Sequence, residues 1–213
     1  MTISEYKELR NVSIDVNTAV FKTAVSNRRI LKAAAKELGL WKNGTVVADK
    51  DIYTTFLMDF IVFEQRIGNR NGVERFYDTA DSFPDEVKEE LLESMLDAFF
   101  SIFIIVDRDS AAATVTLRDV LGEDGTVYVI MDMGFSRTAV IGDYIGIRLI
   151  PVRDAYMTTG APFGFPPSVG ARLLMDYRLQ TLNRKDLAAK INPFLLCFEW
   201  YRKSGRDALL QDV

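Results

Sequence analysis

The sequence contains no histidine and only one cysteine, Cys197. Histidine is the usual general base near neutral pH and the commonest ligand of transition metals. Its absence excludes Ser–His–Asp and Cys–His hydrolysis as well as zinc sites of the ordinary type. One cysteine excludes an internal disulfide, which fits a reducing compartment. The apolar neighbours of Cys197, Leu196 and Phe198, predict a buried, inert thiol. Any catalysis would therefore depend on carboxylates, lysine, tyrosine, this thiol, or a hard metal ion held by oxygen atoms.

Long hydrophobic runs are also missing. The longest strongly apolar run, Ala98–Val106, is interrupted by Ser101 and is far shorter than the roughly 20 residues of a membrane-spanning helix. Residues 1–10 are polar and charged, without the apolar stretch of a signal peptide. We therefore expect a soluble, cytoplasmic protein with no membrane partner.

The charges are unevenly distributed along the chain, whose net charge is −4. Residues 1–50 carry nine lysines and arginines against five acids, residues 51–160 nine against twenty, and residues 161–213 eight against five. One interpretation is that the basic N- and C-terminal segments pack near the acidic middle segment of the chain. The other is that they form a basic surface that binds a polyanion. Because nucleic-acid-binding domains are usually basic overall, the first interpretation is favoured and a nucleic-acid partner is disfavoured.

The order of predicted elements indicates an α+β fold. Residues 1–100 form a mainly helical part, residues 101–160 a β-rich part, and residues 161–213 a pair of C-terminal helices, which we expect to pack as one compact unit. Short strands joined by tight turns predict a central antiparallel β-meander or a small, partly closed barrel. The predicted strands are Ile102–Val106, Ala113–Leu117, Val127–Asp132, Ala139–Ile141, Tyr144–Val152 and Ala155–Thr158.

One alternative function is a helix-turn-helix DNA-binding regulator formed by residues 16–48. The alanine-rich stretch that ends at Leu38-Gly39 resembles the middle of such a motif, with Arg28, Arg29 and Lys32 as its nucleic-acid-binding residues. The next helix would begin near Thr45. Asn43-Gly44 and the β-branched residues after it are poor helix openers, which weakens this interpretation.

A second alternative is a carboxylate-based, Mg²⁺-dependent enzyme. Asp59, Glu64, Asp107 and Asp109 could supply the oxygen ligands that Mg²⁺ prefers. However, Asp59 and Glu64 lie about 140° apart on a helix, and Asp109-Ser110 also fits a plain turn. No catalytic residue, metal ligand or cofactor is therefore assigned, and the sequence leaves open whether the protein is an enzyme.

The favoured hypothesis is a non-enzymatic binding or regulatory protein that acts through protein–protein contact. Phe163 and Phe165 lie in the proline- and glycine-bounded connector 161–167, where we expect them to be exposed. Trp200 belongs to an apolar C-terminal helix and completes the predicted partner-binding set. The partner would be another protein or a second copy of the chain in a homodimer.

Several short segments resemble an uncharacterised group of bacterial proteins. The residues that carry this resemblance are Leu38-Gly39-Leu40-Trp41, Met58-Asp59-Phe60, Arg118-Asp119-Val120-Leu121-Gly122, Arg148-Leu149-Ile150-Pro151 and Met157-Thr158-Thr159-Gly160. Some members of the group carry a terminal SecA-type zinc motif rich in cysteine. That motif is absent here, because Cys197 stands alone, so the resemblance implies no activity.

Overall fold

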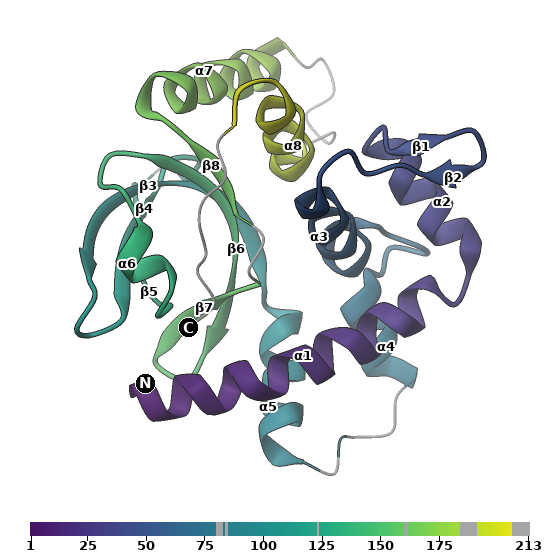
Figure 1. Ribbon diagram of the computed structural model, residues 1–213, viewed down its shortest axis with the longest axis horizontal. Coiled ribbons are helices and arrows are strands. Elements are labelled where there is room, and N and C mark those ends of the chain that lie inside the picture. The colour runs from purple at the N-terminus through teal and green to yellow at the C-terminus, as the bar shows by residue number, and fades with distance from the viewer. Residues whose placement is uncertain (80–82, 84, 123, 160–161, 184–190, 206–213) are drawn as a thin grey trace. The chain divides into compact units, whose positions relative to one another are not determined.

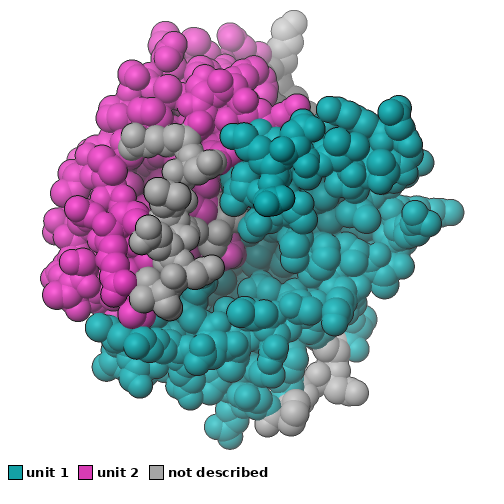
Figure 2. Space-filling model, in the orientation of Figure 1, with its two compact units in different colours: residues 1–98, 150–154 teal, residues 99–149, 155–213 magenta. Residues whose placement is uncertain are grey.

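The structure is a computed structural model that describes residues 1–79, 83, 85–122, 124–159, 162–183 and 191–205. The chain divides into two compact units. The first contains residues 1–98 and 150–154, and the second contains residues 99–149 and 155–213 (Figure 2). Each unit is described by itself.

The first unit is mainly helical, with one short β-hairpin (Figure 1). Its helices are α1 (Ile3–Val25), α2 (Arg28–Glu37), α3 (Asp51–Asp59), the π-helix η1 (Phe60–Glu64), α4 (Gly72–Thr79) and α5 (Glu86–Leu96). The hairpin pairs β1 (Trp41–Lys42) with β2 (Thr45–Val46). Asn43 and Gly44 both have positive φ, as the tight turn of a two-residue hairpin requires.

Helix α1 packs against α4 and α5 through one apolar face. Leu9, Val16 and Val20 are fully buried, at the spacing that places residues on the same side of a helix. At its start, Thr2 and Glu5 form a capping box: the Thr2 hydroxyl accepts from the Glu5 amide, and the Glu5 carboxylate accepts from the Thr2 amide. This capping box fixes Thr2 as the residue that precedes α1.

The second unit contains a small barrel. Its strands are β3 (Phe99–Asp109), β4 (Thr114–Asp119), β5 (Val127–Met131), β6 (Tyr144–Val152), β7 (Ala155–Thr158) and β8 (Phe163–Phe165), where the last residues of β6 belong to the first unit. The strand order is β3-β4-β5-β7-β6, β3 also pairs with β6, and β8 pairs antiparallel with β6. These pairings close a ring of strands, which confirms the α+β class and the predicted small barrel.

The connections of the ring are those of an OB-fold barrel. The pairings of β3 with β4, of β3 with β6 and of β4 with β5 are antiparallel, and that of β5 with β7 is parallel at Ile130 and Tyr156. The short helix α6 (Phe135–Thr138) lies between β5 and β6 in the chain. A fold of this kind serves many functions, so the function has to be argued from particular residues.

Strand β3 closes the ring because it is long and bent. Residues Phe99–Ile104 pair with β6, and Phe103–Asp109 pair with β4 across a bulge between Ile105 and Asp107. A bulge bends a strand and increases its twist, which lets one strand join both sides of a barrel. The barrel core consists of Phe103, Ile105, Val115, Leu117, Ile130, Phe135, Ala139, Ile145, Ile147 and Leu149.

Two further helices complete the second unit, α7 (Pro167–Asn183) and α8 (Pro193–Ser204). The Asn192 side chain accepts from the amides of Phe194 and Leu195, and Pro193 occupies the first turn of α8, where no amide hydrogen is needed. Phe194 packs edge-on against Phe163 of β8. Within the described residues, no helix is both long enough and apolar enough to cross a membrane.

Candidate functional site: the exposed face of helix α7

One side of α7 packs on the rest of the second unit. Val169 and Leu173, four residues apart, are buried there. Gly170 lies against the Tyr144 ring of β6, where a Cβ atom would stand 2.2 Å from Cγ of that ring. Glycine is therefore needed for this close approach, which fixes the side of α7 that faces inward.

The opposite side of α7 carries three large apolar side chains. Met175, Leu179 and Leu182 are 62%, 47% and 81% exposed. At about 100° per residue, these three side chains lie within an arc of roughly 60° on the side of the helix away from Leu173. We call them the α7 stripe. Exposed apolar side chains are usually scattered singly, so a group of three on one side of a helix is a candidate contact surface.

Arginines stand on both sides of the α7 stripe. Arg172 and Arg178 are exposed, and the helical rotation places them on opposite flanks. The one acidic residue of α7, Asp176, is engaged elsewhere: its carboxylate accepts from Nε1 of Trp200 at 2.9 Å and from the Gln180 amide at 3.0 Å. Both donors are uncharged, so they do not cancel the charge of Asp176, and the α7 stripe is bordered by two arginines and one carboxylate.

The outer face of strands β4 and β5 is the second exposed apolar area. Val127 and Val129 are 54% and 49% exposed, and they lie opposite Arg118 and Thr116 of β4. On β3, the exposed Asp107 pairs with Thr116. Barrels that bind oligonucleotides on this face use positive grooves and aromatic stacking platforms. This face has one arginine beside a carboxylate and no aromatic residue at an outward position, so it does not have that character.

The predicted partner-binding residues are not on the surface as expected. Phe163 and Phe165 are fully buried, because residues 163–165 form strand β8 and pair with β6. The expectation that they are exposed is therefore wrong. Trp200 is half-buried on α8 and donates to Asp176, which places it between α7 and α8.

The helix-turn-helix hypothesis lacks its last element. Arg28, Arg29 and Lys32 are exposed on α2, and the Lys32 ammonium lies 5.7 Å from the centre of the Trp41 ring. A recognition helix would have to begin near Thr45, but residues 41–46 form the β1–β2 hairpin. The β-branched residues after Asn43-Gly44 favour this hairpin, so the prediction of a helix-turn-helix over residues 16–48 is wrong.

The carboxylates considered for magnesium are not gathered together. In the described parts of the chain, no three acidic or cysteine side chains lie close enough to share a metal ion. Asp109 accepts from the amides of Ala111 and Ala112 and so stabilises a turn. Glu37 and Glu64 interact: burial, with a smaller contribution from the Glu64 charge, raises the pKa of Glu37.

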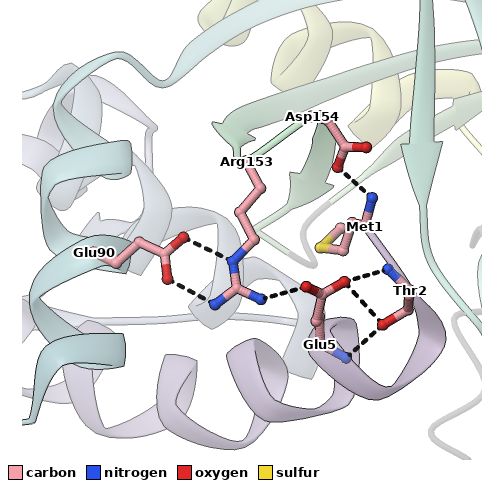
Figure 3. Close-up of polar contacts among 6 residues, drawn as sticks. All are labelled: Met1, Thr2, Glu5, Glu90, Arg153 and Asp154. Carbon is pink, nitrogen blue, oxygen red and sulfur yellow. Dashed lines mark hydrogen bonds and ion pairs between the residues drawn. The ribbon is translucent and has the colours of Figure 1, made fainter.

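A cluster of five charged groups in the first unit is held together by ion pairs. Arg153 binds the Glu90 carboxylate with two parallel hydrogen bonds of 2.8 Å and also pairs with Glu5 at 3.5 Å (Figure 3). The amino group of Met1 pairs with Asp154. Each of these charges pairs with an opposite one, so we interpret the cluster as a structural contact at the β6–β7 turn.

Cys197 is fully buried on α8, and burial raises the pKa of its thiol. A buried thiol without a nearby cation is a poor nucleophile. Among the described residues, therefore, the α7 stripe is the surface with the clearest capacity to bind. Its signal was visible in the sequence, because Met175, Leu179 and Leu182 follow helical spacing on the side away from Val169 and Leu173.

Comparison with known proteins adds a family assignment. No curated protein matches the chain, and no solved structure does. The family model described as "Family of unknown function (DUF7986)" matches residues 1–211. The chain therefore belongs to this family of unknown function.

Proposed function

We propose that the chain is a non-enzymatic binding protein that acts through protein–protein contact, with the α7 stripe as its contact surface. The observation that carries the proposal is the exposure of Met175, Leu179 and Leu182 on one side of a helix whose other side is held by the barrel. Covering these side chains removes apolar surface from water and so favours association.

The helix is suited to this role because its position does not depend on the partner. Gly170 and Leu173 pack one side of α7 against the rest of the second unit. The hydrogen bond between Asp176 and Trp200 joins α7 to α8. A surface held in place before binding loses little conformational entropy when the partner arrives.

We also propose a regulatory role in a bacterial cytoplasm. The single cysteine is what a reducing compartment permits, and the short segments that resemble bacterial proteins support that origin. A second copy of the chain is another occupant to be tested for the same surface.

The test is site-specific photocrosslinking in the cells that naturally produce the protein. A photoreactive phenylalanine replaces Leu179 in one variant and Thr181, an exposed polar residue on another side of α7, in a matched control. We expect one discrete adduct from position 179, with a protein identified by mass spectrometry, and none from position 181.

The same experiment includes Met175→Ser and Leu182→Ser in the position-179 variant. These changes should remove the adduct while circular dichroism shows an unchanged fold. Equal adducts from both positions, or no adduct from position 179, would overturn the proposal. An adduct of twice the chain mass would identify the partner as a second copy.

A further inference from the structure

We infer that the α7 stripe binds an amphipathic helix whose own apolar stripe is flanked by acidic residues. This inference rests on the proposed function and specifies the chemistry of the partner. The argument uses the shape of the stripe, the sign of the charges beside it, and the symmetry that a second copy would impose.

The shape of the surface fits a helix. From Met175 to Leu182 the stripe runs about 10 Å along the helix axis at about 1.5 Å per residue. A straight row of side chains at i, i+4 and i+7 forms a ridge, and ridges of this kind pack into the grooves of another helix.

The charges select the sign of the partner. Arg172 and Arg178 lie on opposite flanks of the stripe, and they outnumber Asp176, the one acidic residue of α7. Glutamate or aspartate on both flanks of the partner would meet both guanidinium groups, while lysine would be repelled. Complementary charge of this kind raises the association rate and the specificity of an interface more than its final affinity.

The same charges disfavour a second copy packed α7 against α7. Two-fold symmetry brings each surface against its own image, so each residue meets the same patch of the copy. In an antiparallel pair, the Arg178 flank of one helix faces the Arg178 flank of the other, and the Arg172 flanks likewise face each other. In a pair centred on the stripe, the two Arg178 side chains lie close together and repel each other, while the two Arg172 side chains are about 20 Å apart along the axis.

A membrane surface is the competing class of partner for an apolar stripe with basic flanks. Helices that lie on membranes usually insert aromatic side chains and a broad apolar face. The α7 stripe has three aliphatic side chains and no aromatic one, and the other side of the helix is occupied by the barrel. These features favour a helix of a partner protein over a membrane surface as the ligand of the α7 stripe.

The experiment uses the full chain and two synthetic helical peptides of about 20 residues, a length that allows helix formation. Both peptides carry the same leucine stripe. One has glutamate at every flanking position and the other has lysine. Fluorescence anisotropy at about 0.05 M and about 0.3 M salt measures binding, since screening weakens charge pairing at the higher concentration.

We expect the glutamate peptide to bind at least roughly tenfold more tightly than the lysine peptide, with a difference that shrinks at the higher salt concentration. Arg172→Glu with Arg178→Glu should reverse the preference. Arg28→Glu with Arg29→Glu, a matched change of two exposed arginines on α2, should leave it unchanged. Leu179→Ser should weaken the binding of both peptides. Thermal melting confirms that each variant is folded.

Equal binding of the two peptides, or a preference that survives the charge reversal at positions 172 and 178, would overturn the inference. If crosslinking at position 179 yields a protein but the glutamate peptide has no advantage, the proposed function stands and the acidic-helix inference falls. If anionic phosphatidylglycerol vesicles bind the chain through Leu179 and neither peptide binds, both proposals give way to a membrane-surface function.

Discussion

The sulfur atom of Cys197 on α8 stands where a side chain at Gly146 of β6 would have to be. A Cβ atom at Gly146 would lie 2.7 Å from the Cys197 Sγ atom and 3.1 Å from the edge of the Phe100 ring. The thiol and the glycine are therefore complementary: one supplies volume that the other leaves free.

Gly146→Ala should lower the free energy of unfolding by about 1–3 kcal/mol, because the new methyl group meets the sulfur atom. Cys197→Ala alone should cost about 1 kcal/mol through the lost volume. Together the two changes should cost less than their sum, since the methyl group occupies space that the sulfur has left. Urea unfolding of the four proteins measures this coupling, and strictly additive losses would contradict it.

The Cys197 thiol should not react with a thiol reagent such as Ellman's reagent while the protein is folded. The side chain is fully buried, and burial raises its pKa, so the reactive thiolate is scarce. Absorbance should show one thiol released in denaturant and almost none in native buffer. Rapid labelling of the native protein would contradict the burial of α8.

The Arg153–Glu90 pair should contribute stability that depends on pH. The hydrogen bonds from Arg153 hold the pKa of Glu90 below its ordinary value of 4.5. A carboxyl group with a lowered folded-state pKa stabilises the protein above its unfolded pKa and loses that contribution as the pH falls through the folded value. Stability from this pair should thus be present at pH 7 and fade at pH values below about 4.5.

Arg153→Met keeps much of the apolar stem and removes the charge. Because both side chains of the pair are partly exposed, we expect a loss of only about 1 kcal/mol at neutral pH, shrinking in acid. Lys203→Met is the control, because Lys203 pairs with Glu199 on the surface of one helix. Removing this exposed pair should cost at most about 0.5 kcal/mol of stability. Thermal melts from pH 3 to pH 7 measure the difference in stability between Arg153→Met and wild type. A difference that grew in acid would contradict the prediction.

Gly170→Ala should loosen α7 from the barrel. Its Cβ atom would stand 2.2 Å from the Tyr144 ring, so the helix or the ring must move, at a cost of about 1–3 kcal/mol. Gly122→Ala is the matched control, because its nearest neighbour would be an Asp119 atom at 3.7 Å. Chemical denaturation should separate the two variants, and equal stability would show that α7 tolerates displacement.

Single-stranded oligonucleotides should bind weakly at physiological salt. The exposed residues Asp107 and Asp109 on β3 balance the charges of Arg108 and Arg118, so these strands offer no net positive charge to phosphate. Anisotropy with a labelled oligothymidine measures the affinity. Tight binding that is lost in Arg118→Ala would indicate that this face of the barrel binds nucleic acid.

Local sequence patterns predict much of the barrel because each strand is defined by its own residues. Tyr144–Val152, rich in β-branched side chains after a Gly142-Asp143 turn, forms a strand with the predicted bounds. Residues 139–141 were predicted as a strand by the same criterion, and that is wrong. Val140 and Ile141 are exposed after α6, because the backbone of Ile105 pairs with Gly142 and Asp143 instead.

What the sequence could not predict depends on contacts between distant segments. Phe163–Phe165 lacks strand periodicity and becomes β8 because β6 offers a free edge next to it. The α7 stripe has a clear helical period, but the spacing does not say which side of a helix is covered. That choice follows from the contact of Gly170 with Tyr144, which joins parts of the chain far apart in sequence.

The β6–β7 turn affects the order in which the chain can fold during synthesis. A ribosome releases residues 1–98 well before residues 150–154, yet both segments form the first unit. Glu5 and Glu90 therefore emerge without Arg153 and carry unpaired negative charge until most of the barrel strands have followed. Completion of the N-terminal unit is thus delayed until the barrel sequence has been translated, and a fragment cut at Ala98 would lack the cation that joins two of its helices.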